Sequence, residues 1–530
     1  MGAGRQAGLY WQSRMGNNHD GIGGNCHRYD VVTMAADGAP VEECLAVDFG
    51  IKIHNGEGPY SCSFTAPDGL FAEAAAPAGP QVRALLLTHA HEDHIGALRH
   101  ALDMGYRLPP IYCTAFTAQM VNKSLHHAGI IEPARRPEIH VMETPQTVQL
   151  GAAEVTFLPV DHLPGASALL LRTPDATVFH TGDYKFDATM PLGRRADPAL
   201  LRKIGRGGVD MVISDSTATG DAAGKTLEAD IEANLTRLLA DQRGRAVVVG
   251  LLGSQLDRLV SLGRAAKANG RALIATGASL CANIAAAESA GLSVQRAIGA
   301  PLLTALDGRQ ITADRAVVVT TGAFAQENAG LTRASQTLPG ALYIGADTTV
   351  VIPQRAIPPV AANHQAMLER LQRLGATVIT AENAPRLGYG ALHQSGHAIA
   401  ADTRLLYSLL KPKGAVIPMH GAPAQIAANA EIARALGIEA LSLPCNGMTV
   451  RLSRQGATVV AFEEVPRIAA VDTGAVKQLP RARPGEGRRP PPPPVFRYDR
   501  LDGSGTRVQA ADMAPFAGPS RVPTRGGRSG

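Results

Sequence analysis

The chain has 530 residues, enough for about three domains and a substantial core, which excludes a small disulfide scaffold. Hydrophobic residues make up 45% of the chain and charged residues 18%, as in globular proteins. Aromatic residues make up only 4%, so stacking of bases on aromatic side chains cannot be the main way in which the whole protein would bind a nucleic acid. The net charge of +5 is concentrated in residues 466–530, so a nucleic-acid partner would need a local groove or this tail. The six cysteines form no C-x-x-C pair, so we expect a cytoplasmic protein without disulfides. No run of about 18 apolar residues occurs, so we expect no membrane span.

Short β-branched segments alternate with segments of helical spacing along most of the chain. Helical spacing is clear in 257–270 and 364–375. The strand-like segments, most of them bounded by Gly, Asp or Pro, are 82–88, 153–160, 177–183, 209–215, 245–252, 271–276, 315–322, 375–380 and 414–421. This alternation predicts an α/β fold. Residues 468–530 are rich in proline and arginine and poor in apolar clusters, so we expect this tail to be disordered.

The segment LLLTHAHEDHIGAL places four candidate metal ligands directly after a strand of the buried type: His89, His91, Asp93 and His94. At the end of an extended strand His89 and His91 point the same way, and the turn that follows brings Asp93 and His94 to a neighbouring point. Imidazole and carboxylate groups suit zinc or a similar divalent ion. The four side chains could therefore serve two adjacent metal ions, an arrangement that suits hydrolysis.

Three further candidate ligands follow later strands, and together with the first four they complete a predicted dinuclear site. One metal would be held by His89, His91 and His162, a second by Asp93, His94 and His420, and Asp183 would bridge the two. Asp48 closes the apolar segment LAVDFG, and we expect it to orient a histidine ligand. We expect two divalent ions, with Zn²⁺ favoured and Mn²⁺ or Mg²⁺ as alternatives.

These motifs resemble the five motifs of the metallo-β-lactamase superfamily, at Asp48, the segment 89–94, His162, Asp183 and His420. The segments HTGDYKFD, SDSTATG, HQSGHA and KPKGAVIPMHG are similar to the β-CASP branch of that superfamily, and more particularly to the bacterial ribonuclease J family. The resemblance covers about 20–465. It implies a metallo-β-lactamase αββα sandwich, with its first part at 1–216 and its completing part at 362–467. A β-CASP α/β domain would be inserted at 217–361.

The resemblance also implies roles for residues outside the metal ligands. By position, Asp215 matches the first β-CASP motif, His397 the second and His420 the third. Members of the family use the second-motif histidine near the scissile phosphate, held by the first-motif acid. An imidazole paired with a carboxylate can protonate the leaving oxygen of a phosphodiester, so we expect Asp183, Asp215 and His397 to be catalytic. Capping of the next helix is the alternative role for Asp215.

The segment HQSGHA resembles the family's phosphate-holding loop, where a glycine lets the backbone approach an anion closely. The residues expected to contact phosphate or RNA are His393, Ser395, Gly396, His397 and Ala398. Two turns of the predicted insert, 250–258 and 320–328, correspond in place to turns of the family but differ from them in most residues.

The favoured hypothesis is a metal-dependent ribonuclease that hydrolyses single-stranded RNA, 5′→3′ from the end and also internally, in RNA processing or decay. A β-CASP nuclease acting on DNA is one alternative, because nothing in these residues recognises a 2′-hydroxyl. A hydrolase of a small ester or thioester and a metal-free RNA-binding scaffold are two others. The size of the insert counts against a hydrolase of small esters. The complete set of metal ligands counts against a metal-free scaffold. Single-stranded RNA is the expected partner. The sequence leaves the oligomeric state open, with a homodimer as one alternative.

Overall fold

The computed structural model describes most of the chain. The described ranges are 6–16, 22–54, 60–68, 70–73, 82–220, 224–304, 312–356, 360–441, 444–472 and 496–501. Within these ranges, no helix is long and apolar enough to cross a membrane.

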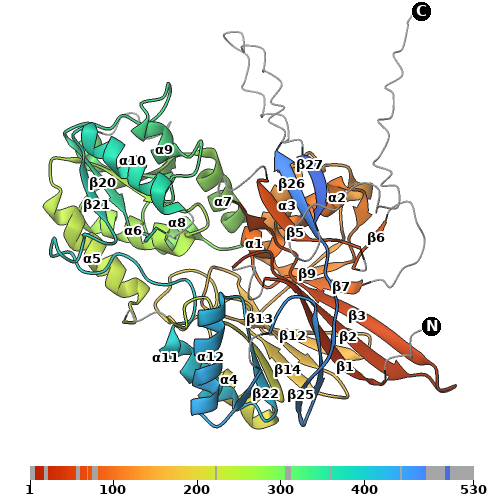
Figure 1. Ribbon diagram of the computed structural model, residues 1–530. Helices are drawn as coiled ribbons and strands as arrows, with labels where there is room; N and C mark the ends of the chain where they lie inside the picture. The colour runs from red at the N-terminus through yellow and green to blue at the C-terminus, as the bar shows by residue number, and fades with distance from the viewer. Residues whose placement is uncertain are drawn as a thin grey trace, which may run out of the picture.

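Two mixed β-sheets pack face to face and form the body of the protein (Figure 1). The eight-stranded sheet has the order β10 (Ile139–Met142), β9 (Ile111–Thr114), β7 (Val82–Leu86), β3 (Pro40–Val47), β2 (Cys26–Met34), β1 (Gly8–Met15), β24 (Met448–Ser453) and β25 (Gly456–Phe462). The seven-stranded sheet has the order β11 (Gln146–Leu150), β12 (Ala153–Pro159), β13 (Ser167–Arg172), β14 (Thr177–His180), β15 (Met211–Asp215), β22 (Ala415–Met419) and β23 (Glu439–Ala440). Trp11 and Tyr29 from the first sheet and Phe157 and Ile417 from the second lie in one buried cluster, so the core lies between the sheets.

Helices cover the outer faces of both sheets. On the eight-stranded sheet, α3 (Ala115–His127) contacts β9, β10 and α2 (Ala97–Asp103). On the seven-stranded sheet, α11 (Ala400–Leu410) contacts α4 (Pro198–Gly207) and α12 (Pro423–Ala435), and α12 contacts β22 (Figure 1). The predicted αββα sandwich is thereby confirmed.

A second α/β unit is inserted between β15 and α11. Its six strands are all parallel, in the order β18 (Leu302–Thr304), β17 (Ala272–Ala275), β19 (Ala316–Thr321), β16 (Ala246–Leu251), β20 (Thr348–Ile352) and β21 (Thr377–Thr380). Its main helices are α5 (Glu228–Asp241), α6 (Leu256–Ala268), α7 (Ala278–Ser289), α9 (Gly330–Ser335) and α10 (Ala361–Arg373). The strands are almost continuously apolar because helices cover both faces of a parallel sheet. The predicted inserted domain is therefore present.

The insert's sheet continues past the boundary predicted at residue 361. Strand β21 pairs in parallel with β20, and α10 packs on α9. We therefore propose that the inserted domain extends at least to Thr380. Beyond it, the chain crosses a loop to α11 and returns through β22, which pairs with β15. This return brings the carboxyl ends of β14, β15 and β22 side by side, which is where the predicted site residues of those segments lie.

The tail predicted to be disordered from residue 468 contributes two strands to a sheet. Strand β26 (Arg467–Asp472) pairs with β5 (Cys62–Thr65) and with β27 (Phe496–Leu501), and β4 (Lys52–Ile53) pairs with β5. Ile468 is 2% exposed. The expectation of disorder therefore does not hold for 468–472 and 496–501. Strand β26 pairs with β5, some 400 residues upstream, and β27 pairs with β26, so the sequence around them carries no local signal of a sheet. Residues 473–495 and 502–530 lie outside the described residues.

Candidate metal centre and active site

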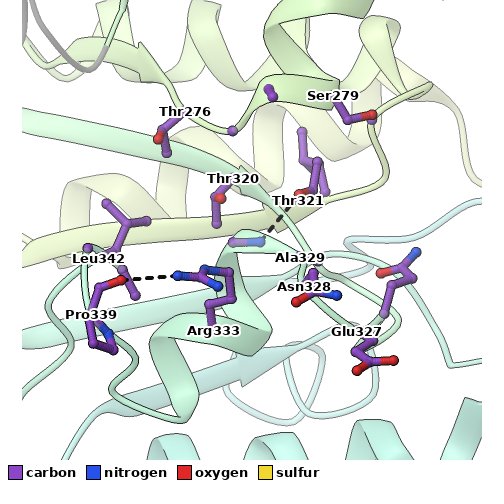
Figure 2. Close-up of a pocket in the computed structure, with 18 residues that line it drawn as sticks. Thr276, Ser279, Thr320, Thr321, Glu327, Asn328, Ala329, Arg333, Pro339 and Leu342 are labelled. Carbon is purple, nitrogen blue, oxygen red and sulfur yellow. Dashed lines mark hydrogen bonds between the residues drawn. The ribbon is translucent and has the colours of Figure 1, made fainter. Parts of the chain in front are cut away.

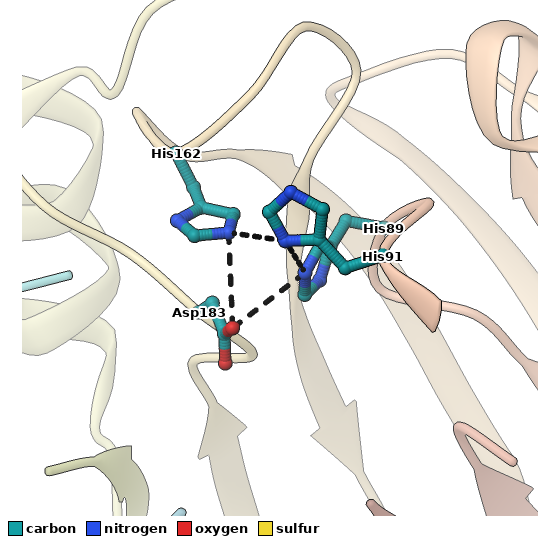
Figure 3. A group of neighbouring side chains, drawn as sticks. All are labelled: His89, His91, His162 and Asp183. Carbon is teal, nitrogen blue, oxygen red and sulfur yellow. Dashed lines mark hydrogen bonds and ion pairs between the residues drawn. The ribbon is translucent and has the colours of Figure 1, made fainter. Parts of the chain in front are cut away.

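The first group of predicted ligands lies where β7 gives way to the short helix α1 (Glu92–Ile95). His91 Nδ1 lies 3.1 Å from His89 Nε2 and 3.0 Å from His162 Nε2, and these two Nε2 atoms lie 3.5 and 3.7 Å from Asp183 Oδ2. Figure 3 shows the three rings and the carboxylate converging on one point, with His89 and His91 from one segment and His162 and Asp183 from two others. Nitrogen ligands about 2.0–2.1 Å from a tetrahedral zinc lie roughly 3.3 Å apart, so these spacings fit one such ion.

A second group of four shares Asp183 with the first. Asp183 Oδ2 lies 3.3 Å from His94 Nε2, and Asp183 Oδ1 lies 2.9 Å from His420 Nδ1. Asp93 Oδ2 completes the group, 3.6 Å from His94 Nε2 and 3.3 Å from His420 Nε2. All ligand atoms within each group lie within 4.8 Å of one another, so the structure brings all seven predicted ligands together as two adjoining groups.

The carboxylate of Asp183 is the group whose burial most directly calls for a bound cation. Its side chain is 1% exposed, and neither carboxylate oxygen accepts a hydrogen bond of normal geometry from the described residues. Burial alone would raise the pKa of Asp183, but His420 and His94 outweigh it and hold the pKa well below its usual range. A buried, ionised carboxylate without donors requires a positive charge beside it. The shared position of Asp183 between the groups therefore fits a pair of divalent ions.

The protonation states of three of the five histidine rings suit metal binding. Burial lowers the pKa of His89 and His162 well below the usual value and lowers that of His91 to about 4. These three rings are thus neutral, the form that binds a metal. For His94 and His420 burial also favours the neutral ring, but the carboxylates around them, Asp183 foremost, raise the pKa above its usual value.

Asp48 holds His94 in place, as its predicted orienting role requires. Asp48 Oδ2 lies 2.7 Å from His94 Nδ1, so this ring nitrogen donates to it and Nε2 faces the metal group. The backbone N–H and the hydroxyl of Thr88 both donate to the same carboxylate, each at 2.8 Å. Asp48 has a φ of 60°, a left-handed conformation that costs a non-glycine residue on the order of 1 kcal/mol. The fold maintains this strained position beside the site.

His162 is oriented by a backbone carbonyl from far along the chain. Its Nδ1 lies 2.6 Å from Gly396 O, which can only accept, so Nδ1 donates and Nε2 faces His91 and Asp183. A Cβ added at Gly396 would come within 3.5 Å of the His162 ring. The segment HQSGHA is therefore packed directly against the first ligand group.

The predicted catalytic pair, Asp215 and His397, is also formed. Asp215 is the last residue of β15 and is fully buried, and its Oδ2 lies 2.9 Å from Nδ1 of His397, whose side chain is 22% exposed. The same His397 nitrogen lies 3.7 Å from Asp183 Oδ2. Burial opposes the charge on both groups, yet each stabilises the other: the pKa of Asp215 is lowered to about 2 and that of His397 is raised. Asp215 Oδ1 also accepts from Thr217 N at 2.9 Å, within the turn after β15. The next helix, α5, begins only at Glu228, so Asp215 does not cap it.

The remaining residues of the predicted phosphate loop differ in their positions. Ser395 Oγ accepts from His397 N at 3.0 Å, which fixes the turn of the loop. Ala398 is 1% exposed and packs in the core, so only its backbone can serve a ligand. Burial and the nearby charges of Arg258 and Arg355 lower the pKa of His393 to about 3, which makes its ring neutral.

Sequence reasoning missed several polar side chains that contact the ligands, and Asn25 and Thr217 are two of them. Asn25 Nδ2 lies 3.0 Å from His94 Nε2 and donates to Asp93 O at 3.2 Å. Thr217 Oγ1 donates to His420 O at 2.9 Å and supports the left-handed backbone there, where φ is 52°. Asn25 follows two glycines and Thr217 follows the predicted Asp215, but neither position forms a pattern that indicates metal chemistry.

A separate pocket of about 870 Å³ opens in the insert, at the carboxyl ends of β16, β17 and β19. Figure 2 shows Thr276 and Thr320 at the strand ends, Ser279 at the start of α7, and Glu327 on the turn before α9. The pocket brings the two turns singled out in the sequence, 250–258 and 320–328, to one place. Ligands of open α/β sheets bind at this edge of the sheet.

Fold and site together define a metallo-β-lactamase-type hydrolase with a β-CASP insert. The beta-lactamase superfamily domain model matches residues 62–247, and the model for the ribonuclease J beta-CASP domain matches residues 243–372. The chain is 30% identical to ribonuclease J of Mycolicibacterium smegmatis over 403 residues, which cover 74% of this chain and 69% of that protein. It is 30% identical to ribonuclease J of Sinorhizobium meliloti over 430 residues, which cover 80% of this chain and 71% of that protein. The chain belongs to the ribonuclease J family.

Two more distant similarities agree with this assignment. Ribonuclease J2 of Bacillus subtilis is 27% identical over 361 residues, which cover 68% of this chain and 62% of that protein. Among solved structures, a protein of unknown function from Enterococcus faecalis V583 matches with a TM-score of 0.55 and 16% identity, over 84% of this chain and all of that one. The latter match supports the fold alone.

Proposed function

We propose that this protein is a metal-dependent ribonuclease that hydrolyses phosphodiester bonds of single-stranded RNA, 5′→3′ from the end and also internally. The observation that carries this function is the position of Asp183. It is a buried carboxylate shared by two ligand groups, and its Oδ2 lies 3.7 Å from Nδ1 of His397, the nitrogen that pairs with Asp215. The family relationship supplies the substrate class, because its named members are ribonucleases.

We assign His89, His91 and His162 to one metal ion and Asp93, His94 and His420 to the other, with Asp183 between them. The five imidazoles favour Zn²⁺ over Mg²⁺, which prefers oxygen ligands, and Mn²⁺ is the alternative. Bound divalent ions supply electrostatic stabilisation for the charge that develops on the phosphate and activate the attacking water.

His397 acts as the proton donor in this proposal. Its Nδ1–H is taken by Asp215, so Nε2 is the nitrogen available to a substrate. The paired carboxylate raises the pKa of His397, which keeps a proton on Nε2 for transfer to the leaving oxygen. The partial exposure of the ring allows this contact, whereas Asp215 stays out of solvent and serves only to hold and charge the ring.

We assign substrate binding to two places. The backbone of Ser395 to Ala398 lies beside His162 and His397, where amide groups can accommodate a terminal monophosphate. The pocket of the insert, with its hydroxyl groups and the Arg333 guanidinium, offers contacts to the RNA chain. Arg333 donates to Pro339 O at 3.0 Å, so its orientation is fixed by the pocket wall (Figure 2).

The test is cleavage by purified protein, with Zn²⁺ or Mn²⁺, of RNA that carries a 5′-monophosphate, a 5′-triphosphate or a 5′-hydroxyl, and of DNA of the same sequence. We expect stepwise 5′→3′ degradation of monophosphorylated RNA, slower attack on the triphosphorylated end and little cleavage of DNA. Equal decay from both phosphorylated ends would contradict the assignment of the phosphate loop. Faster cleavage of DNA would contradict the substrate class.

A further inference from the structure

The loop that carries His397 is tied to the insert by a buried ion pair. Arg258, near the start of α6, and Glu228, at the start of α5, are 5% and 3% exposed. Arg258 Nε and Nη2 donate to the two oxygens of Glu228 at 2.7 and 3.0 Å, so the pair is bidentate. Arg258 Nη1 donates to Leu392 O at 2.7 Å, and Gln394 Nε2 donates to Glu228 Oε2 at 2.8 Å. The ion pair therefore forms hydrogen bonds to Leu392 and Gln394, two residues of the loop just before His397.

The next two residues of the same loop are held from the side of the metal groups. Lys185, which is 6% exposed, donates through Nζ to Ser395 O at 3.2 Å. Gly396 O accepts from His162 Nδ1 at 2.6 Å. Four residues of the segment 392–396 are thus fixed by hydrogen bonds to buried side chains from two parts of the fold, and His397 follows immediately.

The form of these contacts points to positioning. A buried ion pair contributes little net stability against a packed apolar pair, because desolvation offsets the attraction. Here the guanidinium also donates to O of Pro353, the residue after β20, at 3.3 Å, so one rigid planar group of Arg258 connects the end of β20, α5 and the loop. A lysine could not reproduce this fork geometry. These hydrogen bonds of the Arg258 guanidinium fix the distance between the insert and the loop.

We propose that Arg258 is a positioning residue for the proton donor: with Glu228 and Gln394 it sets the place of the loop 392–397 and so of the His397 ring. The inference rests on the proposed function, since it needs RNA cleavage and a role for His397 in it. Neither Arg258 nor Glu228 touches the ligand groups through any hydrogen bond or ion pair found among the described residues, so their effect on turnover passes through the loop.

The test is a double-mutant cycle of Arg258→Lys with His397→Ala, measured as kcat and KM on monophosphorylated RNA at saturating metal. We expect Arg258→Lys alone to lower kcat by about 10–100-fold, as loss of an orienting contact does at other sites, with KM and bound metal little changed. In the His397→Ala background, the same substitution should change kcat less than about threefold, because the group it positions is gone. Gln394→Ala leaves the ion pair intact and should lower kcat by a smaller factor. In the His397→Ala background, this substitution too should change kcat little.

Arg271→Lys is the matched control. Arg271 is also a buried arginine of the insert, 7% exposed, and it donates to the carbonyls of Arg245 and Ala316 at 3.1 and 3.3 Å, at the start of strands and away from the loop. We expect it to lower the melting temperature without changing kcat per folded molecule.

Three results would overturn the inference. Wild-type kcat in both Arg258→Lys and Gln394→Ala would show that the loop needs no such anchor. Equal losses from Arg258→Lys with and without His397 would show general structural damage, as would an equal loss in Arg271→Lys. Failure of the proposed function is distinguishable, because it would appear as absence of RNA cleavage by the unmodified protein.

Discussion

His397 Nδ1 lies 2.9 Å from Oδ2 of Asp215, a carboxylate at the end of β15 that is closed off from solvent. The two residues are 182 positions apart in the chain, with the whole insert between them. The pair exists because the chain leaves the sandwich after β15, builds the insert and returns beside the same strand. In the proposed mechanism, proton donation by His397 therefore depends on the correct placement of the insert.

Substitution of His397 tests proton donation separately from metal binding. His397→Ala should lower kcat by about 10²–10⁴-fold, because the leaving oxygen loses its general acid. Metal content, measured on the purified variant by mass spectrometry, should stay at the level of the unmodified protein. Asp215→Asn should reduce kcat as well, since the amide cannot hold the ring in its charged form. Loss of metal from His397→Ala would instead identify this residue as a ligand.

Substitution of Asp48 tests the orientation of His94. Asp48→Ala removes the carboxylate 2.7 Å from His94 Nδ1, and we expect metal affinity to fall by about 10–100-fold. Competition with a chelator of known affinity measures the change. Asp37 is an exposed acidic residue that accepts a hydrogen bond from Ala39 N in its own turn, so Asp37→Ala should bind metal as the unmodified protein does. Unchanged affinity in Asp48→Ala would contradict the orienting role.

The strand β26 provides a prediction about stability. Ile468 pairs with Phe64 of β5 and lies in a buried hydrophobic cluster, so Ile468→Ala should cost about 2–5 kcal/mol of the free energy of unfolding. Val460, on the edge strand β25, is 49% exposed, and Val460→Ala should change that free energy by less than about 0.5 kcal/mol. Urea unfolding measures both. Equal, small effects would mean that β26 is not part of the packed structure.

The ligand groups could be predicted from the sequence because each ligand lies in the loop or short helix that follows a strand, and strand ends are marked locally by an apolar run followed by a polar turn. Long-range pairing leaves no such mark. The segment RIAAVD (467–472) is short and lies next to a proline-rich, arginine-rich stretch, and its role follows only from its pairing with Cys62–Thr65. Arg258 and Glu228 likewise look like ordinary charged helix residues in the sequence. Their burial follows from how α5 and α6 pack on the returning loop.

The ion pair of Glu228 predicts a dependence of stability on pH. Burial alone would raise the pKa of Glu228, but Arg258, Gln394 and Lys185 lower it to about 2 from an ordinary value of 4.5. A carboxyl group with a lowered pKa in the folded state stabilises the protein fully above pH 4.5 and loses this contribution as the pH falls towards 2. Glu228→Gln should therefore melt at a lower temperature than the unmodified protein at pH 7, and the gap should narrow between pH 5 and pH 3. A difference in melting temperature that stays the same from pH 5 to pH 3 would contradict the ion pair of Glu228 with Arg258.

Removal and return of the metal test the central claim most directly. Protein stripped by a chelator is titrated with Zn²⁺ or Mn²⁺, and cleavage of 5′-monophosphorylated single-stranded RNA is followed together with bound metal, for the unmodified chain and for Asp183→Ala. We predict no cleavage without metal and a return of cleavage that saturates near two ions per chain. Asp183→Ala should stay inactive throughout, because both ligand groups lose their shared carboxylate. RNA cleavage by the stripped protein, or normal cleavage by Asp183→Ala, would contradict the account.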